Sequence, residues 1–445
     1  MMNEFIHMTS AVMPPQITLS LEMWIAILTI ISLLLFAAGV QLMLVFGIWV
    51  VGFHMVVPAF PFENMAVTAY TEVESFAYIA IPFFILVGDI FNRTNVSEEI
   101  IAFSRSVAGW LPGSTGNTAI ATSGVFSAIT GSNAATTASV GQALYPSMEE
   151  EGYKDSHAAA TIAAGGTIGS VLPPSILLII YGVLFGLSVP SLFIAGILPG
   201  LAMICILIGV NTVISHRRGY GQKAAAYEFS LKDIGKTAWM ARIGLGTVIV
   251  LLGGIFAGIF TPSEAAVVAV AYILITAYAD GRIESLKEIV DAGITSLILV
   301  GVLMPVIVLA VLLQQNLSYI GFQKVVSEAI LTLEARWAII IAILAILMMT
   351  GSALASTPNI VLTAPLLAPV AYELGIDPIT WGVIFIFSDA MGFITPPYGL
   401  NLYIMSGLTD IDYMVLAYNA LPYLIGLFVV LTTLLVFPEV NFLAN

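Results

Sequence analysis

The sequence predicts an all-α, polytopic membrane protein that contains an inverted repeat with two re-entrant helical hairpins. Composition is the first reason, because 59% of the 445 residues are hydrophobic, 9% are charged and the mean hydropathy is +1.03. A soluble chain of this length needs far more polar surface. Two further observations indicate the architecture: two stretches repeat each other, and most of the few basic residues fall on one side of the predicted membrane.

Ten apolar runs are candidates for membrane spans, which need about 20 residues each. Hydrophobic residues follow one another in these runs and do not alternate with polar ones, so helices are expected and not the strands of a barrel. The basic residues form no patch with aromatic residues, and we therefore expect no nucleic-acid partner. The runs lie near residues 20–37, 41–57, 76–92, 157–187, 191–215, 243–260, 264–279, 292–316, 376–408 and 413–437.

The repeat is visible in two short motifs. Thr130-Gly131-Ser132 recurs as Thr350-Gly351-Ser352, and Pro173-Pro174 recurs as Pro396-Pro397. The two copies of each motif are separated by nearly the same stretch of chain, so they describe one register with a three-residue insertion in the second copy. A duplicated unit with interrupted helices is how many secondary transporters build a central site.

The basic residues predict the orientation. Six of the 13 crowd into the loop at 216–242, which should be cytoplasmic by the positive-inside rule. Counting spans outward from this loop leaves only Lys324 and Arg336 outside and puts both termini outside as well. Five crossings then separate the two repeats, so the second copy is inverted relative to the first. The six are Arg217, Arg218, Lys223, Lys232, Lys236 and Arg242.

Each repeat contains an apolar segment that is broken in its middle. Residues 113–147 are interrupted by Gly131-Ser132-Asn133, and residues 335–370 by Gly351-Ser352. Two full crossings need about 40 residues plus a turn, so each segment is expected to be a re-entrant hairpin; two ordinary crossings with a kink are the alternative. Non-helical backbone is stable at this depth only where protein or water satisfies it. The two tips should therefore face each other inside the protein.

The proline pairs predict interrupted helices beside these tips. Proline lacks the amide proton and clashes with the preceding turn, so each pair opens its helix and frees carbonyl groups. Free carbonyls next to small hydroxyl side chains are hard oxygen ligands of the kind that bind sodium. We expect one sodium site in each repeat and no other metal or cofactor. A plain proline kink is the alternative.

No Lys or Arg lies near these breaks, so an anionic substrate would meet the N-termini of half-helices at the hairpin tips. Asp389 is the one acid placed deep in a span, where a charge is costly. Two interpretations stay open: a carboxylate that couples to a bound cation, or a structural carboxylate satisfied by freed amides. The polar residues expected to face the cavity are Asn133, Thr136, Thr137, Ser356, Thr357, Asn359 and Asn401.

Several motifs together resemble one known family over nearly the whole chain. They include Ile81 to Gly88, Thr130-Gly131-Ser132, Gly165 to Pro174, Phe260 to Ala266 and Thr395 to Leu402. In this order they are similar to the large membrane subunit of tripartite ATP-independent periplasmic (TRAP) transporters. The resemblance implies sodium-coupled uptake of an organic anion, usually a carboxylate, across the bacterial inner membrane. It implies no enzymatic activity.

The resemblance also implies an elevator mechanism and two partners, a small four-helix membrane subunit and a periplasmic binding protein that delivers the substrate. Scaffold and transport domains then alternate along the chain. The expected division is N-terminal scaffold at 1–79, first transport repeat at 80–187, central scaffold at 188–302, second transport repeat at 303–410 and C-terminal scaffold at 411–445.

Carried over by position, the resemblance implies two sets of sodium ligands. The first set is Ser132, Asn133, Gly166, Thr167, Gly169 and Val171. The second set is Gly351, Ser352, Gly392, Thr395 and Pro396.

Two other kinds of protein compete with this interpretation. The nearer one is a sodium- or proton-coupled anion transporter or antiporter that works without a binding protein, because it shares inverted hairpins. The second is an intramembrane aspartyl enzyme that uses Asp89 and Asp389. The glycine context expected beside such an aspartate is missing, which argues against the enzyme.

Overall fold

The computed structural model describes residues 20–57, 61–74, 76–94, 96–221, 228–283, 285–441 and 443. Expectations for residues 1–19, for Lys223 in the central loop and for residues 442, 444 and 445 lie outside these ranges. Within the described ranges every regular element is helical, as the continuous apolar runs predict.

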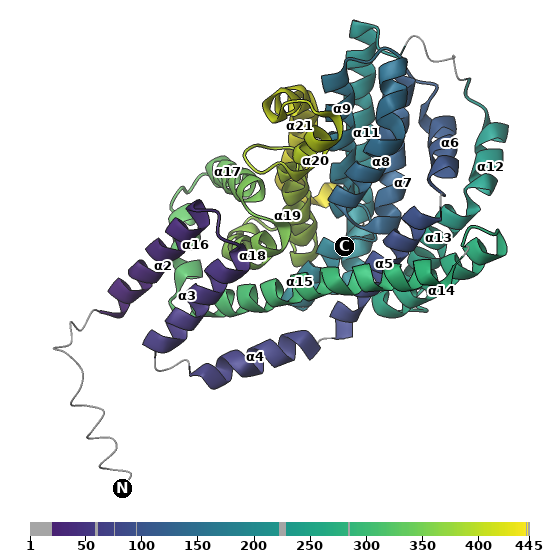
Figure 1. Cartoon of the computed structure of the whole chain (residues 1–445). Helices are drawn as coiled ribbons and strands as arrows, with labels where there is room; N and C mark the ends of the chain where they lie inside the picture. The colour runs from purple at the N-terminus through teal and green to yellow at the C-terminus, as the bar shows by residue number, and fades with distance from the viewer. Residues whose placement is uncertain are drawn as a thin grey trace.

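The helices fall into four groups along the chain (Figure 1). The N-terminal group is α2 (Leu21–Ala37), α3 (Leu42–Val56), α4 (Phe62–Glu74) and η1 (Phe76–Ile79). The first repeat is α5 (Ala80–Arg93), α6 (Ser97–Ala108), α7 (Ser114–Thr130), α8 (Asn133–Glu150), α9 (Asp155–Gly166), η2 (Thr167–Ser170), α10 (Ile176–Phe185) and α11 (Val189–Arg218). The connecting group is α12 (Leu231–Met240), α13 (Arg242–Phe256) and α14 (Pro262–Ala279). The second repeat is α15 (Leu286–Tyr319), α16 (Phe322–Leu331), α17 (Arg336–Ala353), α18 (Ser356–Glu373), α19 (Pro378–Gly392), α20 (Leu400–Thr409) and α21 (Tyr413–Val436), followed by η3 (Pro438–Val440).

The duplication is reproduced helix by helix. Helices α8 and α18 each have 18 residues, and they begin at equivalent positions in the register that aligns the two proline pairs. Helices α9 and α19 also begin at equivalent positions in that register. The series α5 to α11 therefore corresponds in order to α15 to α21, which is more of the chain than the two short motifs indicate.

Five described helices are long and apolar enough to cross a membrane: α11, α14, α15, α17 and α21. A sixth candidate is the pair α12 and α13, which bends by 83° at its break. Helices α2, α3, α10 and α19 are apolar but shorter. The predicted runs 157–187 and 376–408 are not single spans, because each contains two helices separated by a proline pair.

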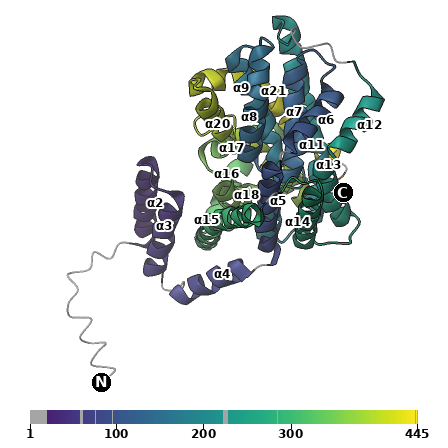
Figure 2. The same ribbon diagram turned by 45° about the vertical axis from the view of Figure 1, so that its right-hand side comes forward.

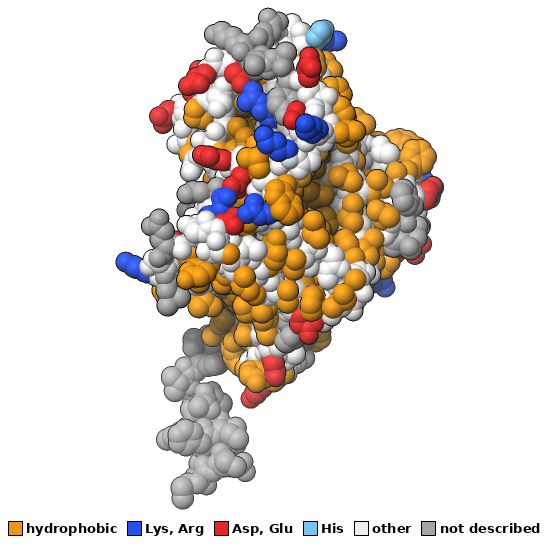
Figure 3. All heavy atoms as spheres, turned by 90° about the vertical axis from the view of Figure 1, so that its right-hand side faces the viewer, with side chains coloured by type: hydrophobic (Ala, Val, Ile, Leu, Met, Phe, Trp, Pro, Cys, Tyr) orange, Lys and Arg blue, Asp and Glu red, His pale blue; other side chains and the backbone are white. Residues whose placement is uncertain are grey.

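The surface agrees with a bilayer environment. Figure 3 shows hydrophobic side chains over much of one face, with basic side chains gathered in its upper part. Ile249 on α13 and Ile275 on α14 are 70% and 68% exposed. Large aliphatic side chains exposed this far are stable in lipid and would be a liability in water.

Four helices of the first repeat and the last long helix of the second repeat pack into one bundle. Helices α7, α8, α9 and α11 run side by side (Figures 1 and 2), and α21 packs against both α9 and α11. Helices α2 and α3 form a pair at the edge of the molecule, where α3 contacts α15. The first hairpin thus lies away from the N-terminal pair and next to α11 and α21. Leu354 and Leu362 of the second hairpin instead share a pocket with residues of α2 and α3.

A buried polar network holds this bundle together. The hydroxyl groups of Thr161 and Tyr423 lie 2.7 Å apart and join α9 to α21. Asn211 on α11 donates from Nδ2 to Oδ1 of Asn117 on α7 at 2.8 Å, and its Oδ1 lies 3.3 Å from Nε2 of His157. All five side chains are buried. Because each partner satisfies another away from water, the network fixes the mutual positions of these four helices.

Candidate functional site

The first hairpin consists of α7 and α8, and its tip is Gly131-Ser132, as predicted. Gly131 has φ of +59°, in the left-handed region that favours glycine. Ser132 caps α8 by accepting a hydrogen bond from the backbone N–H of Ala135 at 3.4 Å. The tip touches the interrupted helix of its own repeat, since a Cβ on Gly169 would lie 2.8 Å from the backbone nitrogen of Asn133. Glycine at 169 therefore permits this contact.

A second glycine brings the two repeats together. A Cβ on Gly166 would lie 1.8 Å from Oγ1 of Thr137 and 3.0 Å from Nδ2 of Asn401. Asn401 belongs to α20 of the second repeat, yet its Nδ2 donates to the carbonyl of Ala163 on α9 at 3.0 Å. Asn401 is fully buried. It therefore joins the two interrupted helices.

The second hairpin consists of α17 and α18, but its break is not at Gly351-Ser352. Both residues lie in the last turn of α17, and the helix ends just beyond the predicted break, at Leu354-Ala355. The prediction was wrong because it assumed that a tip requires glycine. Leu354 and Ala355 are both extended, with ψ of about 150°, and extended backbone suits any residue.

Gly351 has a different structural role at the same place. A Cβ on Gly392 at the end of α19 would lie 1.9 Å from the carbonyl oxygen of Gly351, so the two backbones touch. The backbone N–H of Tyr398, after the proline pair, donates to the carbonyl of Ser352 at 3.0 Å. The last turn of α17 is thus attached to the interrupted helix of its own repeat, as the first tip is.

Asp389 lies at this contact and is buried. Its Oδ1 accepts a hydrogen bond from Nδ2 of Asn359 on α18 at 2.9 Å. The hydroxyl of Ser356 lies beside the same carboxylate but outside hydrogen-bonding geometry. The structure therefore brings together Asp389, Asn359 and Ser356, which the sequence assigned to two different roles.

Several buried polar atoms around the two tips have no hydrogen-bond partner. In the first repeat they are both side-chain amide atoms of Asn133 and Oγ1 of Thr137. In the second they are Oδ2 of Asp389, Oδ1 of Asn359 and Oγ of Ser388. Buried polar groups are nearly always paired, and grouped oxygens of these types fit a hard cation. The residues present therefore suit one cation in each repeat.

Besides Ser132, four of the predicted hydroxyl residues are already bonded, and one of them is Ser352, whose hydroxyl donates to the carbonyl of Met349 at 3.1 Å. Thr167 donates to the carbonyl of Ala164 at 2.7 Å, and Thr395 donates to that of Met391 at 2.8 Å. Thr136 lies 3.1 Å from Thr130, a residue that the sequence did not select although it belongs to the repeated Thr-Gly-Ser motif. Each oxygen keeps a lone pair that can still face a cation. Of the remaining predicted residues, Val171 and Thr357 are buried and Pro396 is half-buried.

The site offers backbone dipoles in place of basic side chains. Helix α8 begins at Asn133 and α18 at Ser356, so both start at a hairpin tip. Residues 113–147 and 351–401 contain no Lys or Arg. Exposed N–H groups at a helix N-terminus attract anions, and these two helix starts can therefore face an anionic ligand.

The two aspartates that an aspartyl enzyme would need to bring together each bind a different partner. Asp89 forms an ion pair with Arg93 at 3.1 Å, whereas Asp389 is bonded to Asn359. A shared proton between two adjacent carboxylates is the basis of that chemistry. The geometry therefore gives the enzyme hypothesis no support.

Duplicated hairpins whose tips touch interrupted helices, in a chain of apolar helices, define the class of secondary membrane transporters. The fold agrees with this class: the structure of the Alcanivorax borkumensis YdaH transporter superposes with a TM-score of 0.58 over 86% of this chain and 89% of that one, at 14% sequence identity.

The chain belongs to the family described as "Tripartite ATP-independent periplasmic transporter, DctM component", whose sequence model matches residues 27–440. It is 34% identical over 380 residues to the sialic acid TRAP transporter large permease protein SiaM of Vibrio cholerae, covering 83% of this chain and 86% of SiaM. It is 30% identical over 381 residues to the 2,3-diketo-L-gulonate TRAP transporter large permease protein YiaN of Escherichia coli, covering 85% and 89%. The protein is thus a large TRAP permease of the inner membrane, and not an enzyme.

Proposed function

We propose that the protein takes up an organic anion, delivered by a periplasmic binding protein, in symport with sodium. The observation that supports this most directly is the pair of tip contacts, one in each repeat, with unpartnered buried oxygens beside them. The named ligands of related permeases support the substrate class. Sialic acid, C4-dicarboxylates and 2,3-diketo-L-gulonate are carboxylates, and isethionate is a sulfonate, so all of them are organic anions.

The proposed sodium sites differ in charge. The first contains neutral oxygens from Ser132, Asn133 and the backbone near Gly166, Thr167, Gly169 and Val171. The second contains the backbone near Gly351, Ser352, Gly392 and Pro396, with Thr395 and, as an addition to the sequence prediction, the carboxylate of Asp389. A carboxylate strengthens the binding of a hard cation. The second site is therefore proposed as the tighter one.

The substrate is proposed to lie between the two tips, where the starts of α8 and α18 provide partial positive charge. Thr136, Ser356, Thr357 and the helix N-termini are the proposed contacts. Three candidates change role: Thr137 and Asn401 both lie beside Gly166 at the first break, and Asn359 holds Asp389. These three are proposed to position the cation sites beside the substrate.

For the mechanism we propose an elevator in which both hairpins are re-entrant and the second repeat is inverted, with both termini periplasmic. Helix α17 alone is long enough to cross a membrane, so the return of this hairpin to its own side is part of the proposal. The network of Thr161, Tyr423 and Asn211 favours one change to the predicted division. Helices α11 and α21 are proposed to move with the hairpins and not with the scaffold.

Two protein partners complete the proposal, a small four-helix membrane subunit and the periplasmic binding protein. This chain spans 59% of the isethionate TRAP transporter permease protein DctMQ of Oleidesulfovibrio alaskensis and 60% of the sialic acid TRAP transporter permease protein SiaT of Haemophilus influenzae. Those longer chains have room for a second membrane subunit. That supports a small subunit that accompanies this chain.

Uptake into liposomes tests the proposal. Purified large and small subunits are reconstituted, the cognate binding protein is added with labelled substrate, and an inward sodium gradient is compared with potassium. We expect uptake with sodium only, and none without the binding protein. Uptake that persists without the binding protein would support the alternative, an anion transporter or antiporter that works alone. Uptake driven by a proton gradient in potassium would refute sodium coupling.

A further inference from the structure

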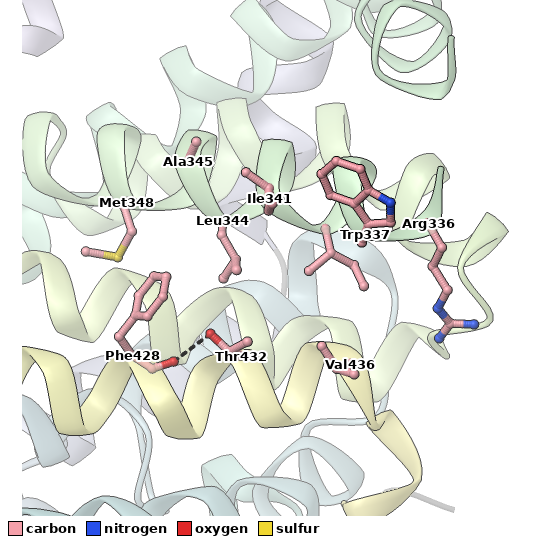
Figure 4. A pocket seen from close by; sticks show the side chains of 10 residues that line it. Arg336, Trp337, Ile341, Leu344, Ala345, Met348, Phe428, Thr432 and Val436 are labelled. Carbon is pink, nitrogen blue, oxygen red and sulfur yellow. Dashed lines mark hydrogen bonds between the residues drawn. The ribbon is translucent and has the colours of Figure 1, made fainter. Parts of the chain in front are cut away.

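An apolar groove of about 690 Å³ lies between α17 and α21 and reaches as far as Met348, about one turn before Gly351. Figure 4 shows side chains of α17 facing Phe428, Thr432 and Val436 of α21 across it. Thr432 is the one uncharged polar residue of the lining, and its hydroxyl is satisfied by the carbonyl of Phe428 at 2.8 Å. Apart from Arg336, the walls of the groove therefore suit a hydrocarbon and offer no free polar group.

One charged residue stands at the end of the groove. Figure 4 places Arg336 at the end opposite Met348, with Trp337 next to it. Among the described side chains no carboxylate forms an ion pair with Arg336, whereas Lys324 on α16 pairs with Glu328 at 3.8 Å. Trp337 is 69% exposed. Arginine and tryptophan are the usual anchors at the boundary between headgroups and hydrocarbon.

The length of the groove indicates how far it extends into the bilayer. Arg336 and Met348 are twelve residues apart on one helix, which corresponds to about 18 Å. One leaflet of the hydrocarbon core is about 15 Å thick, and a transmembrane helix needs the full thickness of about 30 Å. A groove that begins at the interface and ends near the middle of the bilayer matches one acyl chain better than it matches a helix.

We propose that this groove binds an anionic phospholipid, with its phosphate on Arg336 and an acyl chain along Ile341, Leu344 and Ala345. Arginine pairs with phosphate through parallel N–H donors, and among the described residues Arg336 forms no ion pair that would compete with the phosphate. The lipid lies between α17, the first helix of the second hairpin, and α21. It fills a gap that the direct contacts between these two helices leave open.

Fluorescence quenching in vesicles tests this proposal. The complex of large and small subunits is reconstituted in phosphatidylcholine that contains a rising fraction of brominated phosphatidylglycerol or brominated phosphatidylcholine. The signal of Trp337 is obtained by subtracting the emission of a Trp337→Phe variant. We expect half-quenching at an about fivefold lower fraction of the anionic lipid. Arg336→Gln should remove this preference, and Lys324→Gln should retain it.

A second variant tests the groove itself. Ala345 is exposed in the groove wall, so Ala345→Phe fills the space and should abolish the preference while Arg336 stays in place. Met349→Phe, on an exposed part of α17 outside the lining, is the matched control. Equal quenching by both lipids in the unmodified complex would overturn the proposal. So would an unchanged preference in both Arg336→Gln and Ala345→Phe, or the absence of any quenching, which would mean that protein covers the groove.

Discussion

Asn359 donates a hydrogen bond from Nδ2 to Oδ1 of Asp389 at 2.9 Å, and this bond joins the start of α18 to α19 just before its break. In the register that aligns the two proline pairs, the equivalent positions in the first repeat are Thr136 and Gly166. Thr136 is bonded to Thr130 instead. The two repeats are therefore alike in backbone and unlike in charge at this pair of positions, since Asp389 stands where the first repeat has Gly166.

The first prediction concerns this carboxylate. Asp389→Asn keeps the shape and the bond to a side-chain partner but removes the charge, so we expect the sodium concentration for half-maximal uptake to rise about tenfold or more, a loss of about 1.4 kcal/mol. Uptake is measured against sodium concentration in proteoliposomes. Asp410→Asn is the control, because Asp410 is exposed at the end of α20. Unchanged sodium activation in Asp389→Asn would show that the carboxylate is only structural.

The second prediction concerns the contact between backbones. Gly392→Ala places a Cβ 1.9 Å from the carbonyl oxygen of Gly351, and neither backbone atom can give way cheaply. We expect the tip to separate from α19 and sodium-driven uptake to fall to background. Gly407→Ala on α20 is the control, since its Cβ would meet nothing within 4 Å. Comparable activity of the two variants would contradict the assigned contact.

The third prediction concerns the hydroxyl group at the second break. Thr395→Val keeps the volume and removes one oxygen, so sodium activation should weaken about threefold to tenfold, in line with the loss of one buried polar contact. Thr409→Val is matched, because Thr409 makes the same kind of bond to a helix carbonyl, that of Met405 at 2.6 Å, away from the tips. Copurification of the small subunit should be normal in both variants. Equal sodium activation in the two would remove Thr395 from the site.

Much of the fold could be predicted because it depends on local chemistry. The proline pairs interrupt their helices as expected, and Gly131 forms the first tip because its left-handed conformation needs glycine. The second tip could not be placed from the motif, since Leu354 and Ala355 form it with ordinary extended backbone. In the register that aligns the proline pairs, the second Thr-Gly-Ser motif lies three residues before the first, so Leu354-Ala355 is the equivalent of Gly131-Ser132.

Contacts between segments that are distant in the chain could not be predicted from the sequence. Asn401 was assigned to the cavity from its place after the second proline pair, yet it bonds to Ala163 of the other repeat. Likewise His157, Asn211 and Tyr423 are single polar residues in apolar runs, and the sequence shows no spacing that would connect them. Hydropathy indicates that such residues are buried but not which of them meet.

The fourth prediction tests that buried network. Tyr423→Phe removes the hydroxyl that lies 2.7 Å from Oγ1 of Thr161. The free energy of unfolding should therefore decrease by about 1 kcal/mol. The apparent melting temperature of the purified complex measures this. Tyr418→Phe, at a position 75% exposed, should leave stability unchanged. If α9 and α21 belong to one moving body, sodium activation should be normal in Tyr423→Phe; a selective loss of sodium activation without a loss of stability would contradict that.

The central claim is that each repeat holds one sodium ion next to a shared anionic substrate. The most direct measurement is the simultaneous uptake of radiolabelled sodium and labelled substrate by the reconstituted complex with its binding protein. The proposal predicts two sodium ions for each substrate molecule, and fewer in a variant whose second site is lost, such as Asp389→Asn. Substrate uptake without any sodium uptake, or with a single ion in the unmodified complex, would contradict it.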